Sequence, residues 1–255
     1  MAHFGWRAAF IAFGLVSLLW LLPWLVVTRG GAVTASVGPI MRPLPYRVLL
    51  KQRALWGSSL GAFCSFYSYY FLLTWLPLFL VKAHGFSVKE MAQIGASIYA
   101  VHAASSATIG WASDRWIASG GFVNRVRKSA MVVGMLGAAG SIFMCANANP
   151  RGSALLLMMA AFFFGLGSPQ IFAIAQTLGG SRAAGQWMGL QNAVGNLAGI
   201  LAPLLTGVVV DRTGEYFWAF VVVGAVLLIG AVAWGAVIPR VEPVRWPDEL
   251  AIAEL

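Results

Sequence analysis

The sequence predicts an all-α membrane protein with about seven transmembrane helices. Of its 255 residues, 60% are hydrophobic and 10% are charged, whereas soluble domains carry roughly 25% charged residues. The charged residues fall in short clusters, and the apolar runs between them reach about 20 residues, the helical length that crosses a bilayer core. A transmembrane barrel would instead alternate apolar and polar residues in segments of about 10. A soluble fold and a barrel are both excluded.

Seven apolar runs, each bounded by charged or turn-forming residues, are the expected spans. They cover residues 8–27, 54–81, 91–110, 129–146, 153–176, 183–210 and 216–239. The first is too long for the apolar region of a signal peptide, and no small-residue cleavage site follows it, so we read it as a spanning helix. Two connections are long. Residues 28–53 are rich in proline and basic side chains, and residues 114–128 form a second basic connection.

The net charge of +9 follows the ends of these runs rather than a single surface. With seven spans, 12 of the 17 Lys and Arg residues fall on the side that holds residues 28–53, and the other five fall on the opposite side. The positive-inside rule therefore predicts a cytoplasmic linker and C-terminus, with the N-terminus on the outer side. This placement is typical of topology signals, so we expect no nucleic-acid partner. Cys64 and Cys145 lie in apolar runs and should pack as small hydrophobic residues.

A short repeat links the third and sixth spans. The third ends Gly110-Trp-Ala-Ser-Asp114-Arg115, and the sixth ends with the same spacing, Gly207-Val-Val-Val-Asp211-Arg212. The copies lie three helices apart and so emerge on opposite membrane faces, as an inverted repeat requires. Glycine permits close helix packing, and Asp and Arg at a helix end can hold a neighbouring terminus. The alternative is that Asp-Arg simply begins a loop.

These residues resemble the major facilitator superfamily. The string Gly110 to Arg115, followed by Arg125-Val-Arg127-Lys128, is similar to the gating-loop motif of that superfamily. Three further segments resemble its anion:cation symporter branch. They are Thr74-Trp-Leu-Pro77, Gly85-Phe-Ser87 and the stretch 191–203 of the sixth span.

The resemblance implies helices six to twelve of a twelve-helix transporter. Residues 1–28 would be helix six, 29–53 the basic cytoplasmic linker between the halves, 54–239 the six-helix carboxy-terminal half built as a three-plus-three inverted repeat, and 240–255 a cytoplasmic tail. Family members are similar in carrying a substrate-binding arginine and proton-coupling carboxylates in the amino-terminal half. We expect that half to be missing here, because the resemblance covers only helices six to twelve. The interiors of the expected spans hold no Asp, Glu, Lys or Arg, so we expect no charged proton carrier within the membrane in this half.

The function implied by the resemblance is transport of a small organic anion, a sugar acid or an aromatic carboxylate, by alternating access in the inner cell membrane. Coupling to H⁺ is expected in the complete protein, and a truncated chain would be inactive alone. The alternative is a non-transporting fragment, or an assembly partner of a separately encoded amino-terminal half. We expect no enzymatic activity, no cofactor and no metal, because the sequence has no spaced His/Cys cluster, phosphate-binding loop or nucleophile elbow.

Polar side chains inside the spans are the candidates for a substrate cavity, because such groups are costly in a bilayer and face a bundle interior or water. Neutral amides and phenols can bond a carboxylate or a sugar hydroxyl. For each of them the alternative is a hydrogen bond between helices. The candidates are Tyr67 and Tyr70 in the second span, Gln170 and Gln176 in the fifth, and Asn192 and Asn196 in the sixth.

Two further predictions concern ionisable groups. His102 lies in the third span, and an unperturbed imidazole titrates near neutral pH, so it is a candidate proton relay. The alternative is a histidine hydrogen-bonded to a neighbouring helix. Arg125, Arg127 and Lys128 are expected to set topology and to make gating-loop contacts, and the alternative is a patch that binds anionic lipid.

Overall fold

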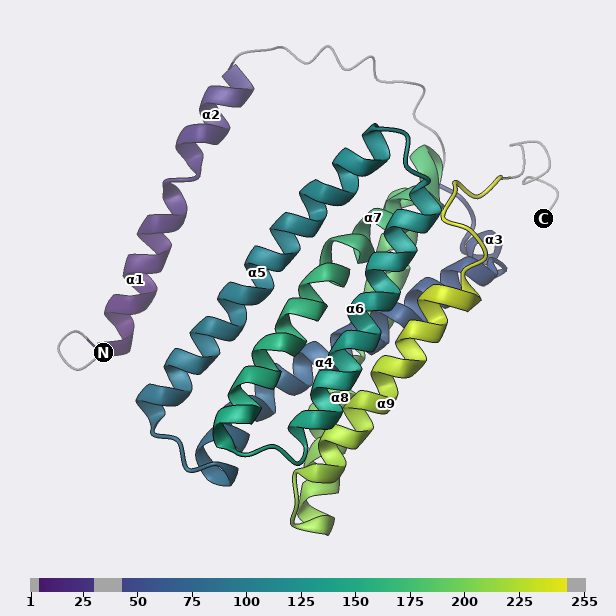
Figure 1. Ribbon diagram of the computed structural model, residues 1–255. Helices are drawn as coiled ribbons and strands as arrows, with labels where there is room; N and C mark the ends of the chain where they lie inside the picture. Colours follow the sequence, from purple (N-terminus) through teal and green to yellow (C-terminus); the bar gives the residue numbers. More distant parts are fainter. Residues whose placement is uncertain (1–4, 30–42, 247–255) are drawn as a thin grey trace. The chain divides into compact units, whose positions relative to one another are not determined.

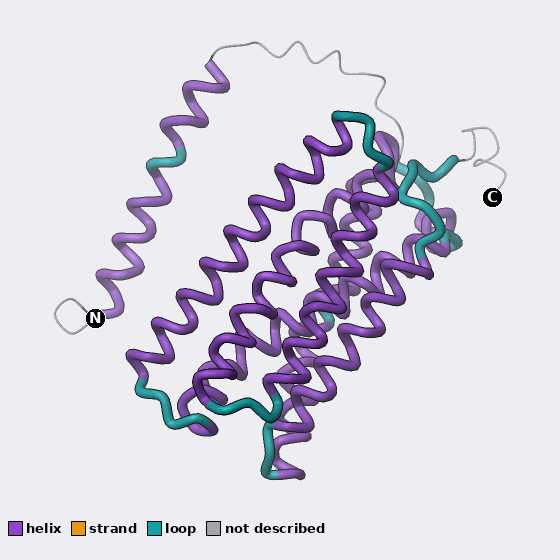
Figure 2. Tube along the Cα trace, in the orientation of Figure 1, coloured by secondary structure: helices purple, strands orange, loops and turns teal. Residues whose placement is uncertain are grey.

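The computed structural model describes residues 5–29 and 43–246, and within these ranges every regular element is a helix (Figures 1 and 2). The chain divides into two compact units, residues 1–42 and residues 43–255. The expected all-helical fold is confirmed.

The first unit contains α1 (Gly5–Leu18) and α2 (Leu21–Arg29). Together they supply a candidate membrane span, Phe10–Thr28, which corresponds to the first expected span. The helix is interrupted at Leu19 and Trp20. Pro23 accounts for the break, because it lacks an N–H and its ring clashes with the carbonyl four residues earlier, that of Leu19.

The second unit is a helical bundle. Its elements are α3 (Tyr46–Leu50), α4 (Arg53–Leu78), η1 (Phe79–Ala83), α5 (Val88–Ala118), α6 (Val123–Cys145), α7 (Pro150–Asn196), α8 (Ala198–Thr213), α9 (Phe217–Val232) and η2 (Ala233–Val237). Helices α4, α6, α7 and α9 supply most of its buried core, including the fully buried Trp187 of α7, and η2 adds the fully buried Trp234. Cys64 and Cys145 are buried free thiols in this core, as expected.

Helix α7 reverses direction at Gly180. The backbone there has φ 60° and ψ −168°, in a region that glycine adopts readily. The chain folds back on itself around this point, since Gln191 donates a hydrogen bond to the carbonyl of Ile171, 20 residues earlier, at 3.4 Å. The 47-residue element is therefore a hairpin of two helices. These correspond to the fifth expected span and to the first part of the sixth, which α8 completes after a break at Leu197.

By length and composition, five helices of the described residues qualify as membrane spans. The stretch 150–213 counts as one of them, although the reversal at Gly180 divides it into two crossings. Helix α5, the third expected span, does not reach the same hydropathy. Its 31 residues are nevertheless long enough to cross a bilayer. Counted in this way, the helices accommodate the seven expected crossings.

Two of the expected connections are shorter than predicted. Helix α5 continues to Ala118 and α6 begins at Val123, so only residues 119–122 separate the two helices. The expected loop 114–128 is therefore mostly helical. In the expected linker 29–53, residues 30–42 lie outside the described residues, but residues 43–50 pack on the bundle, with Leu44, Val48 and Leu49 buried.

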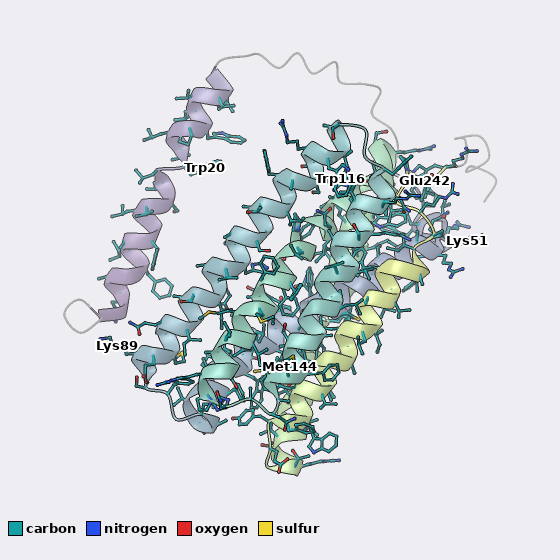
Figure 3. The ribbon with its side chains drawn as sticks, viewed as in Figure 1. Trp20, Lys51, Lys89, Trp116, Met144 and Glu242 are labelled. Carbon is teal, nitrogen blue, oxygen red and sulfur yellow. The ribbon has the colours of Figure 1, made fainter. Side chains whose placement is uncertain are left out.

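The two ends of this bundle differ in their residues. Lys51, Trp116 and Glu242 lie toward one end, and Lys89 and Met144 lie toward the other (Figure 3). The two copies of the Gly-x-x-x-Asp-Arg repeat also lie at opposite ends, because one closes α5 and the other closes α8 (Figure 1). This is the placement that an inverted repeat requires.

Candidate functional site

A hydrogen-bonded polar cluster joins α4 to the end of α7. The hydroxyl of Tyr70 donates to Oδ1 of Asn196 at 2.8 Å. The Asn196 amide nitrogen in turn donates to the carbonyl of Asn192 at 2.8 Å and to its side-chain Oδ1 at 3.1 Å. The structure thus brings together three of the six expected cavity residues. Asn196 is the last residue of α7, and its bond to the carbonyl four residues back is of a kind that bends helices.

This cluster faces outward from the bundle, near the middle of its helices. Asn192 and Asn196 are exposed, and Tyr70 is half-buried. If this face of the bundle met lipid tails, the exposed amides would lie in hydrocarbon, where polar groups without hydrogen-bond partners are costly. The exposed amides therefore indicate a face that meets water or another protein segment rather than lipid tails.

A cavity of about 240 Å³ opens among α4, α5, α6 and α7. Its wall is mainly apolar, and the polar side chains in it are Ser65, Tyr69, Tyr99, His102 and Ser168. The ring of Tyr69 lies edge-on to that of Tyr70, with centroids 5.6 Å apart. The cavity and the polar cluster are thus adjacent through these two tyrosines.

His102 is hydrogen-bonded across the cavity wall to another helix. Its Nε2 lies 2.8 Å from the hydroxyl oxygen of Ser168 on α7. That hydroxyl also lies 3.0 Å from the carbonyl oxygen of Phe164, and which group donates in the bond to Nε2 depends on the tautomer of the imidazole. This is the interhelical bond that was the alternative to a relay.

The other expected cavity residues lie apart from the cluster. Tyr67 is 2% exposed and packs beside Phe63 inside the bundle. Gln170 is also buried, and its amide donates to Ser113 at 3.0 Å and accepts from Arg127 at 3.3 Å. For Gln170 the structure shows the interhelical amide bond that was the alternative. Gln176 is exposed near the end of the first α7 helix.

The charged motif holds α5, α6 and α7 together at one end. Arg127 forms an ion pair with Asp114, NH2 to Oδ1 3.7 Å, in addition to its bond to Gln170. The motif therefore acts between helix ends, rather than within a long loop. Gly110 does not make the close contact expected of it, because a Cβ there would lie 3.8 Å from Pro169, an ordinary contact distance.

Lys128 makes contacts with the carboxyl end of the last helix. Its ammonium group donates to the carbonyls of Gly235 at 3.1 Å and Pro239 at 3.2 Å, and also to that of Ile238. A helix leaves its last carbonyls without intrahelical partners, and a cation there satisfies them and complements the helix dipole. Lys128 therefore fixes α6 to the end of η2.

Comparison with protein-family models decides the family. The model described as Major Facilitator Superfamily matches residues 1–119 and 117–253, which together span nearly the whole chain. The chain belongs to the major facilitator superfamily. Its resemblance to the anion symporter branch is supported by curated relatives named as anion and acid transporters.

Three curated transporters are similar to this chain over most of its length. The chain is 30% identical to the probable sulfoacetate transporter SauU of Cupriavidus necator, over 98% of this chain and 62% of the relative. It is 27% identical to the hexuronate transporter of Bacillus subtilis, over 90% and 57%. It is 29% identical to the probable galactarate/D-glucarate transporter GudP of Bacillus subtilis, over 87% and 54%. The chain thus spans about half the length of the curated relatives it matches.

Solved structures agree with this fold. The Escherichia coli fucose:proton symporter FucP aligns with a TM-score of 0.58 at 14% identity, covering 74% of this chain and 43% of the symporter. A POT family transporter aligns with a TM-score of 0.59 at 17% identity, covering 79% and 43%. As a member of this superfamily, the chain is a multi-pass membrane protein and a transporter-family protein rather than an enzyme.

Tyr69, Tyr99 and Ser168 also line the cavity, although the sequence does not single them out as cavity residues. Tyr69 lies about 100° from Tyr70 around a helix, yet it is exposed and lines the cavity beside the polar cluster. The position of Tyr99 three residues before His102 was a usable signal, because residues three apart share a helix face. Ser168 carries no such signal, since only the packing of α5 on α7 brings it to His102.

Proposed function

We propose that the chain forms the carboxy-terminal half of a transporter for a small organic anion, of the sugar-acid or aromatic carboxylate class. The carrying observation is the exposed cluster of Tyr70, Asn192 and Asn196 near mid-span. These groups are neutral, and the amide and hydroxyl donors that bond one another in this structure would turn to a substrate carboxylate without burying a second charge. The names of the relatives support the anionic class.

The proposed mechanism is alternating access. An amino-terminal half would cover the exposed polar face, so that the substrate lies between the two halves near the bilayer midplane. The break between α7 and α8 lies beside Asn196, which makes this helix discontinuous at the proposed site. Discontinuous helices of this kind form the binding sites of many transporters.

The proposed coupling ion is H⁺, and the proposed location is the inner cell membrane with a cytoplasmic C-terminus. His102 remains a candidate proton relay, because its imidazole lines the cavity and is hydrogen-bonded to a hydroxyl, that of Ser168. The orientation rests on the excess of basic residues at the end that holds Lys51 and the charged motif.

The test uses the gene in its own cells, so that whatever completes the transporter is present. Uptake of labelled hexuronate, galactarate, sulfoacetate and benzoate is compared in wild-type, deletion and Asn196→Ala strains. We expect the deletion to abolish uptake of one of these anions, and Asn196→Ala to raise its KM about tenfold, the effect of a lost hydrogen bond to a charged group. A protonophore should stop the uptake if H⁺ drives it.

The matched control is Asn147→Ala, which removes an exposed asparagine from the turn between α6 and α7. It should leave KM unchanged, with equal protein in the membrane by immunoblot. Uptake of neutral sugars without competition by any carboxylate would refute the anionic class. A deletion strain with unchanged uptake of every substrate would instead favour the second candidate, a non-transporting membrane protein.

A further inference from the structure

The basic residues of the charged motif fall into two groups by their contacts. Arg127 is 16% exposed and is bonded to Asp114 and Gln170. Lys128 is bonded to three carbonyls at the end of η2. Neither is available to a ligand from outside the protein. The lipid patch of Arg125, Arg127 and Lys128, the alternative drawn from the sequence, therefore keeps only Arg125, which is exposed with its guanidinium 5.4 Å from the ring centroid of Phe122.

Arg115 is placed differently. It is exposed in the last turn of α5, where the described residues give it no ion pair. Its guanidinium lies over the indole of Trp111, 5.8 Å from the ring centroid. Asp114, the adjacent acid, is directed to Arg127. Arg115 thus presents a positive charge that is held in place by stacking and is not neutralised by a carboxylate.

A shallow pocket of about 560 Å³ surrounds this guanidinium. Two indoles bound it, Trp111 and Trp116, which are 67% and 62% exposed. Between them the surface is formed by the small residues Ala112, Ala118 and Ser119. Trp116 is held against Gly121, where a Cβ would lie 2.6 Å from the indole ring. Figure 3 shows Trp116 at the end of α5, the depth at which a helix leaves the bilayer.

The second copy of the repeat lacks this arrangement. Arg212 occupies the position of Arg115, but Val208 and Thr213 replace Trp111 and Trp116. Arg212 is exposed, as Arg115 is, and it lies at the end of α8. The two copies thus carry the same Asp-Arg motif, one with flanking indoles and one without them.

We propose that Trp111, Arg115 and Trp116 form a binding site for the headgroup of an anionic glycerophospholipid. A guanidinium matches a phosphate with two parallel hydrogen bonds. Exposed indoles favour the interface between headgroups and acyl chains, where each would flank the lipid backbone. The small residues between them leave the space that the headgroup fills. Charge complementarity selects an anionic lipid over a zwitterionic one, since no carboxylate lines the pocket.

The test is a lipid titration of the purified full chain, followed by native mass spectrometry. Phosphatidylglycerol and phosphatidylcholine with the same acyl chains are added separately, and the apparent Kd of the first bound lipid is measured. We expect phosphatidylglycerol to bind at least fivefold tighter, which corresponds to about 1 kcal/mol for one basic residue at a membrane surface. Arg115→Gln should abolish this preference, and the matched variant Arg212→Gln should retain it.

Trp111→Ala gives a second measurement that does not remove the charge. It should weaken phosphatidylglycerol binding about threefold or more, because the guanidinium loses the ring that holds it. Circular dichroism and a single size-exclusion peak verify that each variant is folded. Equal effects of the Arg115 and Arg212 variants, or equal binding of the two lipids by the wild-type chain, would overturn the proposal.

Discussion

Helices α5 and α7 approach so closely at Gly165 that the structure leaves no room for a side chain. A Cβ at this position would lie 2.6 Å from Cβ of Ser105 and 2.8 Å from the main-chain oxygen of His102. Favourable carbon–carbon contacts lie at about 3.5–4.0 Å. Gly165→Ala must therefore move the helices apart by about 1 Å, which stretches the 2.7 Å bond from Ser105 to the carbonyl of Phe162.

The expected cost is about 1–3 kcal/mol, the usual penalty for adding a methyl group to a well-packed contact. Helix propensity acts in the opposite direction, because alanine is favoured over glycine in a helix by about 1 kcal/mol. Gly140 in α6 isolates that second effect, since a Cβ there would meet nothing within 4 Å. The difference in stability between Gly165→Ala and Gly140→Ala is then about 1–3 kcal/mol.

Thermal unfolding in detergent can be followed with a thiol-reactive dye, because Cys64 and Cys145 are free and buried in the folded chain. We expect Gly140→Ala to unfold at or above the wild-type temperature and Gly165→Ala well below it. Equal unfolding temperatures for the two variants would refute the close packing of α5 on α7. That result would also remove the basis for the contact between His102 and Ser168.

Three further predictions follow from other contacts. Lys128→Met removes the cation that satisfies the carbonyls at the end of η2 and should lower the free energy of unfolding by about 1–3 kcal/mol. The control Lys89→Met, at an exposed site, should change the free energy of unfolding little. Burial lowers the pKa of His84, just beyond the second span, below its ordinary value of 6.5. As pH falls, the unfolded chain therefore binds a proton at this histidine before the folded chain does, so folding stability is full above about pH 6.5 and declines toward pH 5. His84→Gln should flatten this decline in a series of melting curves. Gln186 accepts a hydrogen bond from the main-chain N–H of Leu44 and donates one to the Leu44 carbonyl. Gln186→Glu cannot donate and should therefore increase amide hydrogen exchange at residues 44–50. Unchanged exchange would contradict the docking of this segment on the bundle.

Much of the fold was predictable because the bilayer sets the length and composition of a span. Residues 54–81 and 216–239 matched observed helices closely for that reason, whereas α6 begins at Val123, six residues before the expected span 129–146. The end of α5 was misplaced, because Asp114 and Arg115 resemble the start of a loop. The helix dipole favours Arg115 near the C-terminus of α5, and the ion pair with Arg127 holds Asp114 there. The reversal at Gly180 followed from a gap between two apolar runs, and its geometry came only from the structure.

The site was predictable in its residue types and only partly in its geometry. Intramembrane polarity selected Tyr70, Asn192 and Asn196, which the structure joins in one cluster. The same criterion selected Tyr67 and Gln170, which are buried in the bundle. A polar side chain inside the membrane needs a hydrogen-bond partner, but its residue type does not indicate whether that partner belongs to another helix or to a ligand.

The sequence by itself determined that the chain crosses a membrane many times, because its long apolar runs form helices that satisfy their backbone hydrogen bonds in lipid. It also determined where charges stand relative to the spans. The tertiary structure decided which of those charges are satisfied internally. Arg127 is held by Asp114 and Gln170 on two neighbouring helices, Lys128 is held by a helix end more than 100 residues away, and Arg115 is left beside two indoles at the surface. Such pairings depend on distances between helices, which no single-chain periodicity encodes.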